Sequence, residues 1–278
     1  MSLLVLFSFF LLTMASVSGL STTKAPLRMP STGSSSRPVT YSNPLGVTLA
    51  QIREKVWLAE RPFFPRLPGL QWTDVACKAA IVQLADGTLW VHAPCQLDDE
   101  LRRELKAIGP VAHIVSPNSE HVSFAKAWID AYPEARSYAA PGLKERFPQI
   151  GWQLEISSPP DSWNDEFDAT WIENERAPFK LLGDRPFFSE MVFCHRPSKT
   201  LFVTDLWWNY PAGKAPSHWK FAMDNIYRPV YNGLMRQPGH QNTIDTILNW
   251  NWDYIAPCHG EPIAGPQAKQ TFKDFFNS

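Results

Sequence analysis

The chain has 278 residues, of which 44% are hydrophobic and 13% aromatic, and it contains twelve tryptophans. This composition excludes a disordered or coiled-coil protein and indicates a globular body with a substantial core. Residues 1–53 hold four basic residues and no acid, which leaves 22 basic and 27 acidic residues for residues 54–278. Because a mildly acidic body offers no Lys/Arg-rich stripe to a phosphate backbone, we expect no nucleic-acid partner.

Residues 1–53 have the composition of a targeting segment followed by a linker. The apolar run at 3–15 has the length of a signal peptide and is short for a membrane span. The stretch 21–44 is basic, free of acid and rich in Ser, Thr and Pro, as transit peptides are. This order is the bipartite import arrangement of algae with secondary plastids, so we expect a plastid protein without membrane contact in its mature form. The alternative is a secreted protein with a flexible linker.

Residues 54–278 are expected to fold as a single domain, because this length fits one large domain. The cysteines are scattered singly, without a C-x-x-C pair, which predicts free and buried thiols rather than a disulfide framework. They are Cys77, Cys95, Cys194 and Cys258.

The first half of this domain alternates strands and helices. A strand is predicted at 55–63, and two strands within 77–94 are joined by the Asp86-Gly87 pair, a strong hairpin signal. A helix should begin at Asp98, with acids in its first turn, and stop at Gly109. The pattern then predicts a strand at 111–117, a helix at 121–133, a strand at 134–141 and a short helix at 143–148.

The second half repeats this order with a longer group of strands. Four consecutive strands are predicted at 165–173, 177–182, 189–195 and 200–206. Helices follow at 217–235 and 241–250, then a strand at 253–257 and a terminal helix at 266–276. Two groups of strands, each followed by helical elements, indicate packed sheets covered by helices.

Three strands end abruptly in polar side chains that can bind metal ions. They lie in the segments HIVSPNSEH (113–121), TLFVTD (200–205) and DYIAPCHGEP (253–262). Binding and catalytic residues cluster at the carboxyl ends of strands in α/β sheets, so we expect His121, Asp205 and His259 to lie close together. The structural alternatives are a hydrogen-bonded histidine at each strand end and a turn residue for Asp205.

These three segments resemble, in order and spacing, the metal-binding motifs of the metallo-β-lactamase superfamily. The family has His-x-His-x-Asp-His, a Thr-Gly-Asp-like turn and Pro-Gly-His-Gly. In the first motif this chain has Ser116 and Asn118 where the family has the first two histidines, Glu120 where it has aspartate, and the last histidine, His121, is kept. The segments GTLWVHAP, IVSPN, YAAPGL and VTDL are similar to sequences from a branch of the superfamily found in plants, algae and cyanobacteria.

The resemblance implies an α/β fold, an αββα sandwich of two mixed sheets with helices on the outer faces. It also implies that the second metal position and the bridging carboxylate are kept while the first position is lost. The implied ligands of one divalent ion are Glu120, His121, Asp205 and His259. Such a set favours zinc, with iron or manganese possible, and leaves a position for water, whose pKa the ion lowers to about 7.

Two further residues are candidate catalytic groups. A hairpin with its turn at 196–199 would pair His195 with Thr200 and place Glu190 opposite Asp205, with His195 roughly 17 Å from that end. We therefore prefer Glu190 to His195 as a site residue. His92 ends the strand 88–92 where the superfamily commonly has an aspartate, so it is expected to orient substrate or oxyanion.

The favoured function is a metal-dependent hydrolase that uses metal-bound hydroxide at a mononuclear site on a small ester, lactone, thioester or phosphoester. The base would be Glu190 or Glu120, and the partner is a small-molecule substrate. One alternative is a non-catalytic binding or scaffold protein that keeps the fold. The other is an iron-dependent oxidoreductase. Fold alone does not choose among them.

Overall fold

The computed structural model describes residues 38–63, 75–163, 165–178, 185–211 and 213–277. These residues belong to one compact unit. The apolar run at 3–15 and the first part of the transit-like stretch lie outside the described residues. Within the part of the chain that is described, we find no helix with the length and apolarity that a membrane crossing requires.

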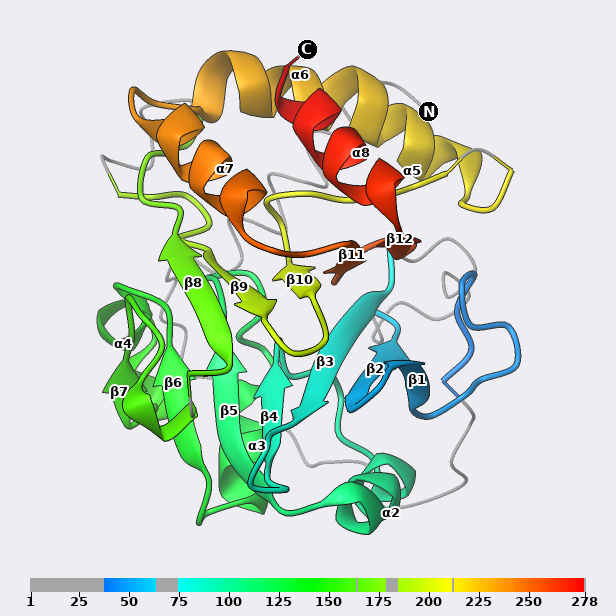
Figure 1. The fold of residues 1–278 in the computed structure, drawn as a ribbon, viewed down its shortest axis with the longest axis vertical. Coiled ribbons are helices and arrows are strands. Elements are labelled where there is room, and N and C mark those ends of the chain that lie inside the picture. Colours follow the sequence, from blue (N-terminus) through cyan, green and yellow to red (C-terminus); the bar gives the residue numbers. More distant parts are fainter. Residues whose placement is uncertain (1–37, 64–74, 164, 179–184, 212, 278) are drawn as a thin grey trace, which may run out of the picture. The chain divides into compact units, whose positions relative to one another are not determined.

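The first sheet has seven strands in the order β1 to β7 (Figure 1). Pairing is antiparallel from β1 to β4 and parallel from β4 to β7. The strands are β1 (Ala50–Arg53), β2 (Val56–Arg61), β3 (Cys77–Gln83), β4 (Leu89–His92), β5 (Val111–Ser116), β6 (Arg136–Ala139) and β7 (Leu154–Glu155).

The second sheet has five strands in the order β12-β11-β10-β9-β8. Only β10 and β11 pair in parallel, and the other neighbours are antiparallel. The strands are β8 (Phe167–Trp171), β9 (Met191–His195), β10 (Thr200–Val203), β11 (Tyr254–Pro257) and β12 (Ile263–Ala264). The predicted hairpin register is confirmed, because Thr200 pairs with His195.

Helical elements connect and cover the two sheets. They are α2 (Asp99–Ile108), α3 (Ala125–Ala131), α4 (Leu143–Arg146), the 3-10 turns η2 (Pro148–Ile150) and η3 (Asp161–Trp163), α5 (Ser217–Ala222), α6 (Arg228–Val230), α7 (His240–Asn249) and α8 (Pro266–Phe276). Two π-helical segments, η5 (Met223–Tyr227) and η6 (Tyr231–Met235), interrupt the region predicted as one helix at 217–235.

The core consists of two layers. Between the sheets, Trp90 of β4 packs on Phe167, Phe193 and Phe202 of the second sheet, with ring centroids 4.5–5.8 Å apart. On the outer face of the first sheet, buried apolar side chains of α2 and α3 join those of the strands. On the outer face of the second sheet, Phe272 of α8 contacts two buried tryptophans, and Figure 1 shows α7 and α8 along that side. The fold is therefore an αββα sandwich of two mixed sheets, as expected.

Local signals explain most of these elements. Asp98 caps α2 by accepting a hydrogen bond from the N–H of Leu101 at 2.8 Å, and Gly109 follows the last turn. The Asp86-Gly87 turn joins β3 and β4. One of the four consecutive strands predicted in the second half is not confirmed: residues 177–178 are not a strand, and 179–182, the rest of that predicted strand, lie outside the described residues.

The N-terminal edge of the unit includes residues before the boundary expected at residue 53. Strand β1 pairs with β2, and the hydroxyl groups of Thr40 and Ser42 both donate to the buried carboxylate of Glu60. The expected boundary therefore falls after the first strand rather than before it. Residues 38–53 are part of the packed unit.

Candidate metal centre

Three loops that follow strand ends bring the candidate ligands together. His121 lies in the loop after β5, Asp205 two residues beyond β10, and His259 two residues beyond β11. Because β10 and β11 run parallel with Val203 opposite Pro257, their next residues emerge at the same edge. The loops also cross between sheets, since the carbonyl of Cys258 accepts the N–H of Lys78 at 3.0 Å. The site therefore sits where the edges of both sheets meet.

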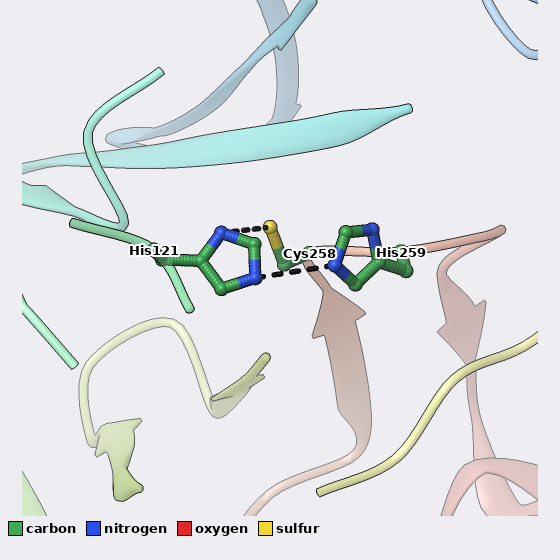
Figure 2. Close-up of side chains that lie close together, drawn as sticks. All are labelled: His121, Cys258 and His259. Carbon is green, nitrogen blue, oxygen red and sulfur yellow. Dashed lines mark hydrogen bonds between the residues drawn. The ribbon is translucent and has the colours of Figure 1, made fainter. Parts of the chain in front are cut away.

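The two imidazoles face each other through their Nε2 atoms, which are 3.1 Å apart (Figure 2). The Nδ1 of His259 lies 2.6 Å from the main-chain carbonyl of Ala76. A carbonyl only accepts hydrogen bonds, so this Nδ1 carries the proton and the Nε2 of neutral His259 is a lone pair directed at His121. The Nδ1 of His121 contacts the sulfur of Cys258 at 3.5 Å.

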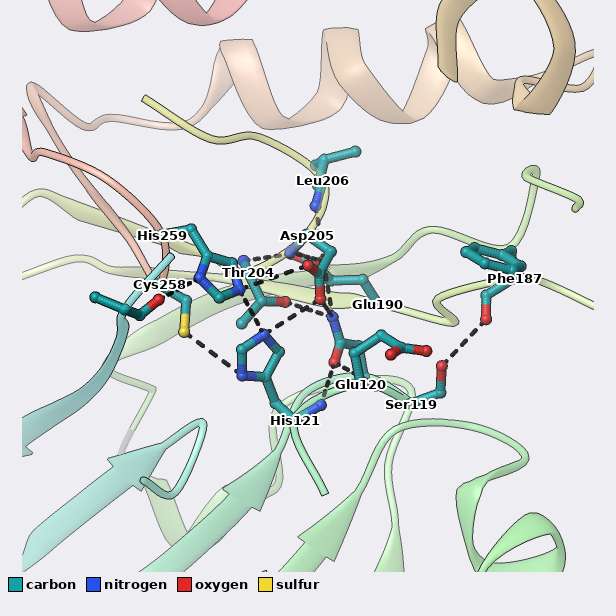
Figure 3. A network of polar contacts seen from close by, with 12 residues as sticks. Ser119, Glu120, His121, Phe187, Glu190, Thr204, Asp205, Leu206, Cys258 and His259 are labelled. Carbon is teal, nitrogen blue, oxygen red and sulfur yellow. Dashed lines mark hydrogen bonds and ion pairs between the residues drawn. The ribbon is translucent and has the colours of Figure 1, made fainter. Parts of the chain in front are cut away.

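Asp205 adds a carboxylate to the two imidazole nitrogens and completes a compact set of candidate metal ligands, the donor set (Figure 3). Its carboxylate lies 3.2 Å from the Nε2 of His121 and 3.6 Å from that of His259. All three side chains are at most 5% exposed. The structure thus brings the polar ends of the three residues expected at the strand ends within 3.6 Å of one another, although they are far apart in the sequence.

Asn118, which stands where the superfamily has a histidine, organises the loop instead of offering an imidazole. Its side-chain amide donates to Asp205 at 2.7 Å and to the hydroxyl of Thr204 at 2.8 Å. Its carbonyl oxygen accepts the main-chain N–H groups of Glu120 and His121. Asn118 therefore holds Asp205 and His121 in place at once.

Ser116, the other residue that stands where the superfamily has a histidine, has a side-chain hydrogen-bond partner outside this set. Its hydroxyl accepts the indole N–H of Trp152 at 3.0 Å. The donors of the first metal position are therefore replaced by groups with structural partners.

Glu190 lies behind the Asp205 turn. Its two carboxylate oxygens accept the main-chain N–H groups of Thr204, Asp205 and Leu206 at 2.7–2.9 Å (Figure 3). The predicted register is observed as far as Phe202 and Phe193, and Glu190 does contact Asp205, but these bonds direct the carboxylate at the backbone. Its contacts are those of a positioning residue.

His92 and Glu120 lie outside the donor set. The ring of His92 stacks on Trp90 in the intersheet core, and its Nε2 has no hydrogen-bond partner among the described residues. Burial, and then His121, lower the pKa of His92 to about 3, so it is neutral. The Glu120 carboxylate points away from the two imidazoles (Figure 3). Burial, and then Asp205, raise the pKa of Glu120 to about 7.

Cys258 belongs to the site, although sequence reasoning assigned it only to the core. Its sulfur, a nitrogen of His121 and a nitrogen of His259 all lie within 4.8 Å of one another. A thiol directly before a candidate ligand, at the end of a buried strand, was the signal available in the sequence. All four cysteines are free and buried, as predicted.

The electrostatics of the cluster favour a positive charge between Asp205 and the imidazoles. Burial, and then His121, lower the pKa of His259 to about 3. For His121, burial acts in the same direction, but Cys258 and Asp205 outweigh it and raise the pKa well above its ordinary value. Burial would raise the pKa of Asp205, yet His121 and its other partners hold it below the usual range. Either a proton on His121 or a metal cation supplies this charge.

The donor set fits a divalent ion. Two ligands about 2.0–2.1 Å from a tetrahedral ion are about 3.4 Å apart. The two Nε2 atoms are 3.1 Å apart, and Asp205 presents a different oxygen to each ring, Oδ2 at 3.2 Å from His121 and Oδ1 at 3.6 Å from His259. Imidazole nitrogen with one carboxylate suits zinc and iron. The two opposed Nε2 atoms are 3.1 Å apart, a contact that is favourable with a proton on the Nε2 of His121 or with a cation between the two rings.

Aromatic rings cover the imidazoles. Phe63 lies 5.4 Å from the ring of His121 and 5.2 Å from that of His259, and Trp208 lies 4.6 Å from His259. A cavity of about 340 Å³, with Glu60 and Lys78 in its wall, lies elsewhere and includes none of the three candidate ligands.

Sequence comparison identifies one family. A family model described as "Domain of unknown function (DUF4336)" matches residues 54–225, a range that contains His121 and Asp205 but ends before His259. A search of curated proteins found no match.

Comparison with solved structures identifies the fold as that of metallo-β-lactamases. DIM-1 metallo-β-lactamase has a TM-score of 0.56 and 11% identity, over 82% of this chain and 96% of its own. FIM-1 metallo-β-lactamase from Pseudomonas aeruginosa, in a mono-zinc form, has a TM-score of 0.56 and 13% identity, over 87% and 97%. A metal-soaked Flv1 flavodiiron core from Synechocystis sp. has a TM-score of 0.58 and 11% identity, over 82% and 60%.

Proposed function

Because the chain belongs to the DUF4336 family and has the metallo-β-lactamase fold, we propose that it is a metal-dependent hydrolase with one divalent ion, held by His121, Asp205 and His259. The observation that carries this proposal is the pair of opposed Nε2 atoms beside Asp205. Two imidazoles and one carboxylate leave a fourth position for water, as catalytic zinc sites do. The proposed substrate is a small ester, lactone, thioester or phosphoester.

A divalent ion at this position would polarise a carbonyl or phosphoryl oxygen and make a bound water acidic near neutral pH. The surrounding residues supply orientation. Asn118 fixes the Asp205 carboxylate, and Glu190 holds the turn that carries it. Burial raises the pKa of both Glu190 and Glu120 to about 7, so the pKa does not choose between them as the base. Both Glu190 oxygens accept main-chain N–H groups, and the Glu120 carboxylate would have to turn toward the ion to accept a proton there.

A second candidate is a closed, non-catalytic metal site. The burial of the three ligands and the rings of Phe63 and Trp208 over the imidazoles favour it, because structural sites exclude water and catalytic sites keep an open position. The two candidates share their ligands and differ in access to the ion.

Metal analysis of the purified full-length chain tests the shared part. We expect one zinc or iron ion per chain, lost on dialysis against a chelator and regained on adding metal. The matched variant is Asp205→Asn, which keeps the size of the side chain and removes its charge. A wild-type chain that takes up no ion from any divalent metal would overturn both candidates.

A substrate screen then separates the two. Chromogenic esters, lactones, thioesters and phosphodiesters are assayed with the metal-loaded protein, the stripped protein and Asp205→Asn. The hydrolase proposal expects one class to be cleaved by the loaded wild-type protein alone. A tightly held ion with no turnover in any class would favour the closed site.

A further inference from the structure

Both imidazoles of the candidate site are held by hydrogen bonds at Nδ1, but the two partners differ. His259 is held by the carbonyl of Ala76 at 2.6 Å and His121 by the sulfur of Cys258 at 3.5 Å. Both Nδ1 atoms point away from the Nε2 atoms that face each other (Figure 2). A ligating histidine usually donates its other ring N–H to a protein acceptor, which orients the ring and raises its basicity.

We propose that Cys258 is a positioning residue for the metal site, an inference that rests on the proposed function. The sulfur accepts the Nδ1–H of His121 and thereby directs the Nε2 lone pair of His121 at the ion. Cys258, His121 and the ion would form a sulfur–histidine–metal triad. It is the counterpart of the Ala76 carbonyl at His259, and the two acceptors together set both imidazoles in the ligating orientation.

The backbone of Cys258 is placed to hold the sulfur in this position. Its N–H donates to the carbonyl of Val203 at 2.8 Å, and its carbonyl accepts the N–H of Lys78 at 3.0 Å. Cys258 is therefore fixed between the two sheets, and only its side-chain rotamer is free. The residue is 2% exposed, so water does not compete for the Nδ1 of His121.

The sulfur also differs from a carbonyl in a useful way. A thiol can donate as well as accept, whereas the Ala76 carbonyl can only accept. Without metal, the Nε2 of His121 carries a proton, because the Nε2 of His259 is a lone pair, and the sulfur can accept from an Nδ1–H or donate to an Nδ1 lone pair. With metal bound, the Nδ1 carries the proton and donates to the sulfur. Cys258 is thus compatible with His121 in both forms.

The alternative role for Cys258 is that of a metal ligand, because its sulfur lies within 4.8 Å of both histidine nitrogens. We favour positioning, since the sulfur contacts the Nδ1 of His121 while Asp205 and His259 contact its Nε2. One ion cannot bind both nitrogens of the same ring. Three protein ligands also leave the open position that the hydrolase proposal needs.

Zinc affinity of full-length variants, measured by chelator competition, gives the first test. Cys258→Ala should weaken zinc binding by about 10–100-fold, the usual loss when a partner of a ligating histidine is removed. Cys258→Ser keeps an acceptor and should lose less than about tenfold. Cys95→Ala, which removes another buried sulfur from the same core cluster, should bind zinc as the wild type does. Thermal unfolding of all three variants controls for folding.

Cobalt substitution of the wild-type protein gives the second test and needs no variant. The visible bands of the bound ion should appear without a sulfur-to-cobalt charge-transfer band in the near ultraviolet. Proton NMR of the cobalt form should show two slowly exchanging imidazole N–H signals, and Cys258→Ala should lose one of them to exchange with water.

The outcomes are distinct. A sulfur-to-cobalt band, or wild-type zinc affinity in folded Cys258→Ala, would overturn the positioning role while leaving the metal site intact. No cobalt or zinc binding by the wild-type protein would instead overturn the proposed function. Equal losses in Cys258→Ser and Cys258→Ala would also contradict the proposal, because hydrogen-bond acceptance would then have no effect.

Discussion

At the scale of single residues, the site depends on side chains that hold the candidate ligands as much as on the ligands. Asn118 binds Asp205 through its amide and the backbone of His121 through its oxygen. Glu190 accepts three main-chain N–H groups of the turn that carries Asp205. Of the two, Glu190 is the one that the sequence predicts as a catalytic group, and the structure gives it a positioning role instead. Their contacts explain how the loops that carry His121 and Asp205 keep their geometry.

Replacing Asp205 should remove metal binding and spare the fold. We expect Asp205→Ala to bind less than about a tenth of an ion per chain, since the loss of a charged ligand weakens binding beyond the loss of an uncharged partner. The sheets should stay folded, because the remaining groups are neutral imidazoles and an amide. Metal content and circular dichroism check this. An unfolded variant, or one that still binds an ion, would contradict it.

Replacing Glu190 should destabilise the protein. Glu190→Gln turns one acceptor oxygen into an NH₂ group that faces buried main-chain donors, which costs about 1–3 kcal/mol. The exposed Glu173→Gln is the control and should change the free energy of unfolding by less than about 0.5 kcal/mol. Urea unfolding measures both. A stable Glu190→Gln with reduced hydrolysis would instead favour the catalytic role expected from the sequence.

At the scale of elements, the parallel pair β10–β11 and the loops that follow it form the frame of the site. Asn209, after Asp205, and Gly260, after His259, form a parallel bridge. Gly260 has φ of 86°, and a Cβ there would lie 1.9 Å from the carbonyl oxygen of Asn209. The glycine is therefore required for the two ligand-bearing loops to approach each other.

Substituting this glycine should affect both stability and metal binding. Gly260→Ala combines a left-handed backbone with a steric clash and should cost about 2–4 kcal/mol, with weaker zinc binding because His259 is its neighbour. Gly233→Ala is the matched control. It lies in η6 with open space around it, and should shift stability by less than about 1 kcal/mol in the favourable direction. Equal effects of the two substitutions would contradict the role given to Gly260.

At the scale of the whole molecule, buried histidines away from the site make stability depend on pH. Burial, and then Arg136, lower the pKa of His113 to about 4 against the opposing effect of Asp86. Burial, and then Arg236, lower the pKa of His240 to about 4. The folded state therefore keeps both rings neutral where the unfolded chain protonates them. The free energy of unfolding has the full contribution of the neutral His113 and His240 above about pH 6.5, and this contribution is lost as the pH falls toward about 4.

Thermal unfolding checks this dependence. We expect the melting temperature to fall between about pH 7 and about pH 5, and to fall less in His113→Gln, whose amide can still bond to the Tyr138 hydroxyl that contacts His113 at 3.1 Å. A melting temperature that rises toward pH 5 in the wild-type chain would contradict the direction. An identical slope in His113→Gln would assign the effect to other groups.

The N-terminal segment is a separate prediction at this scale. We propose that residues 1–53 direct the chain to the plastid by way of the secretory route, since the segment opens with a short apolar run and holds no acid. A fluorescent protein carrying residues 1–53 should accumulate in the plastid. Secretion to the medium would favour the alternative leader, and cytosolic fluorescence would exclude both. A shorter fusion of residues 1–37 separates targeting from β1, which lies in the folded unit.

Much of the architecture could be predicted from the sequence, because its signals are local. The Asp86-Gly87 turn, the Asp98 cap of α2 and the register of β9 with β10 each depend on a few neighbouring residues. Chain order and spacing also placed His121, Asp205 and His259 at strand ends that a sandwich brings together. By itself, the sequence therefore determined the order of the main elements, without the short edge strands β1, β7 and β12, and it determined which residues arrive at the edge.

The tertiary structure alone decided what each side chain does there. The direction of the Glu190 carboxylate, the stacking of His92 in the core and the contact of Cys258 with His121 depend on rotamers and on distances between sheets. The pattern of residues along one strand carries no information about rotamers or about the distances between sheets. Strand β1 was missed for the same reason, because an edge strand of four residues is stabilised by its pairing with β2 and not by its own pattern.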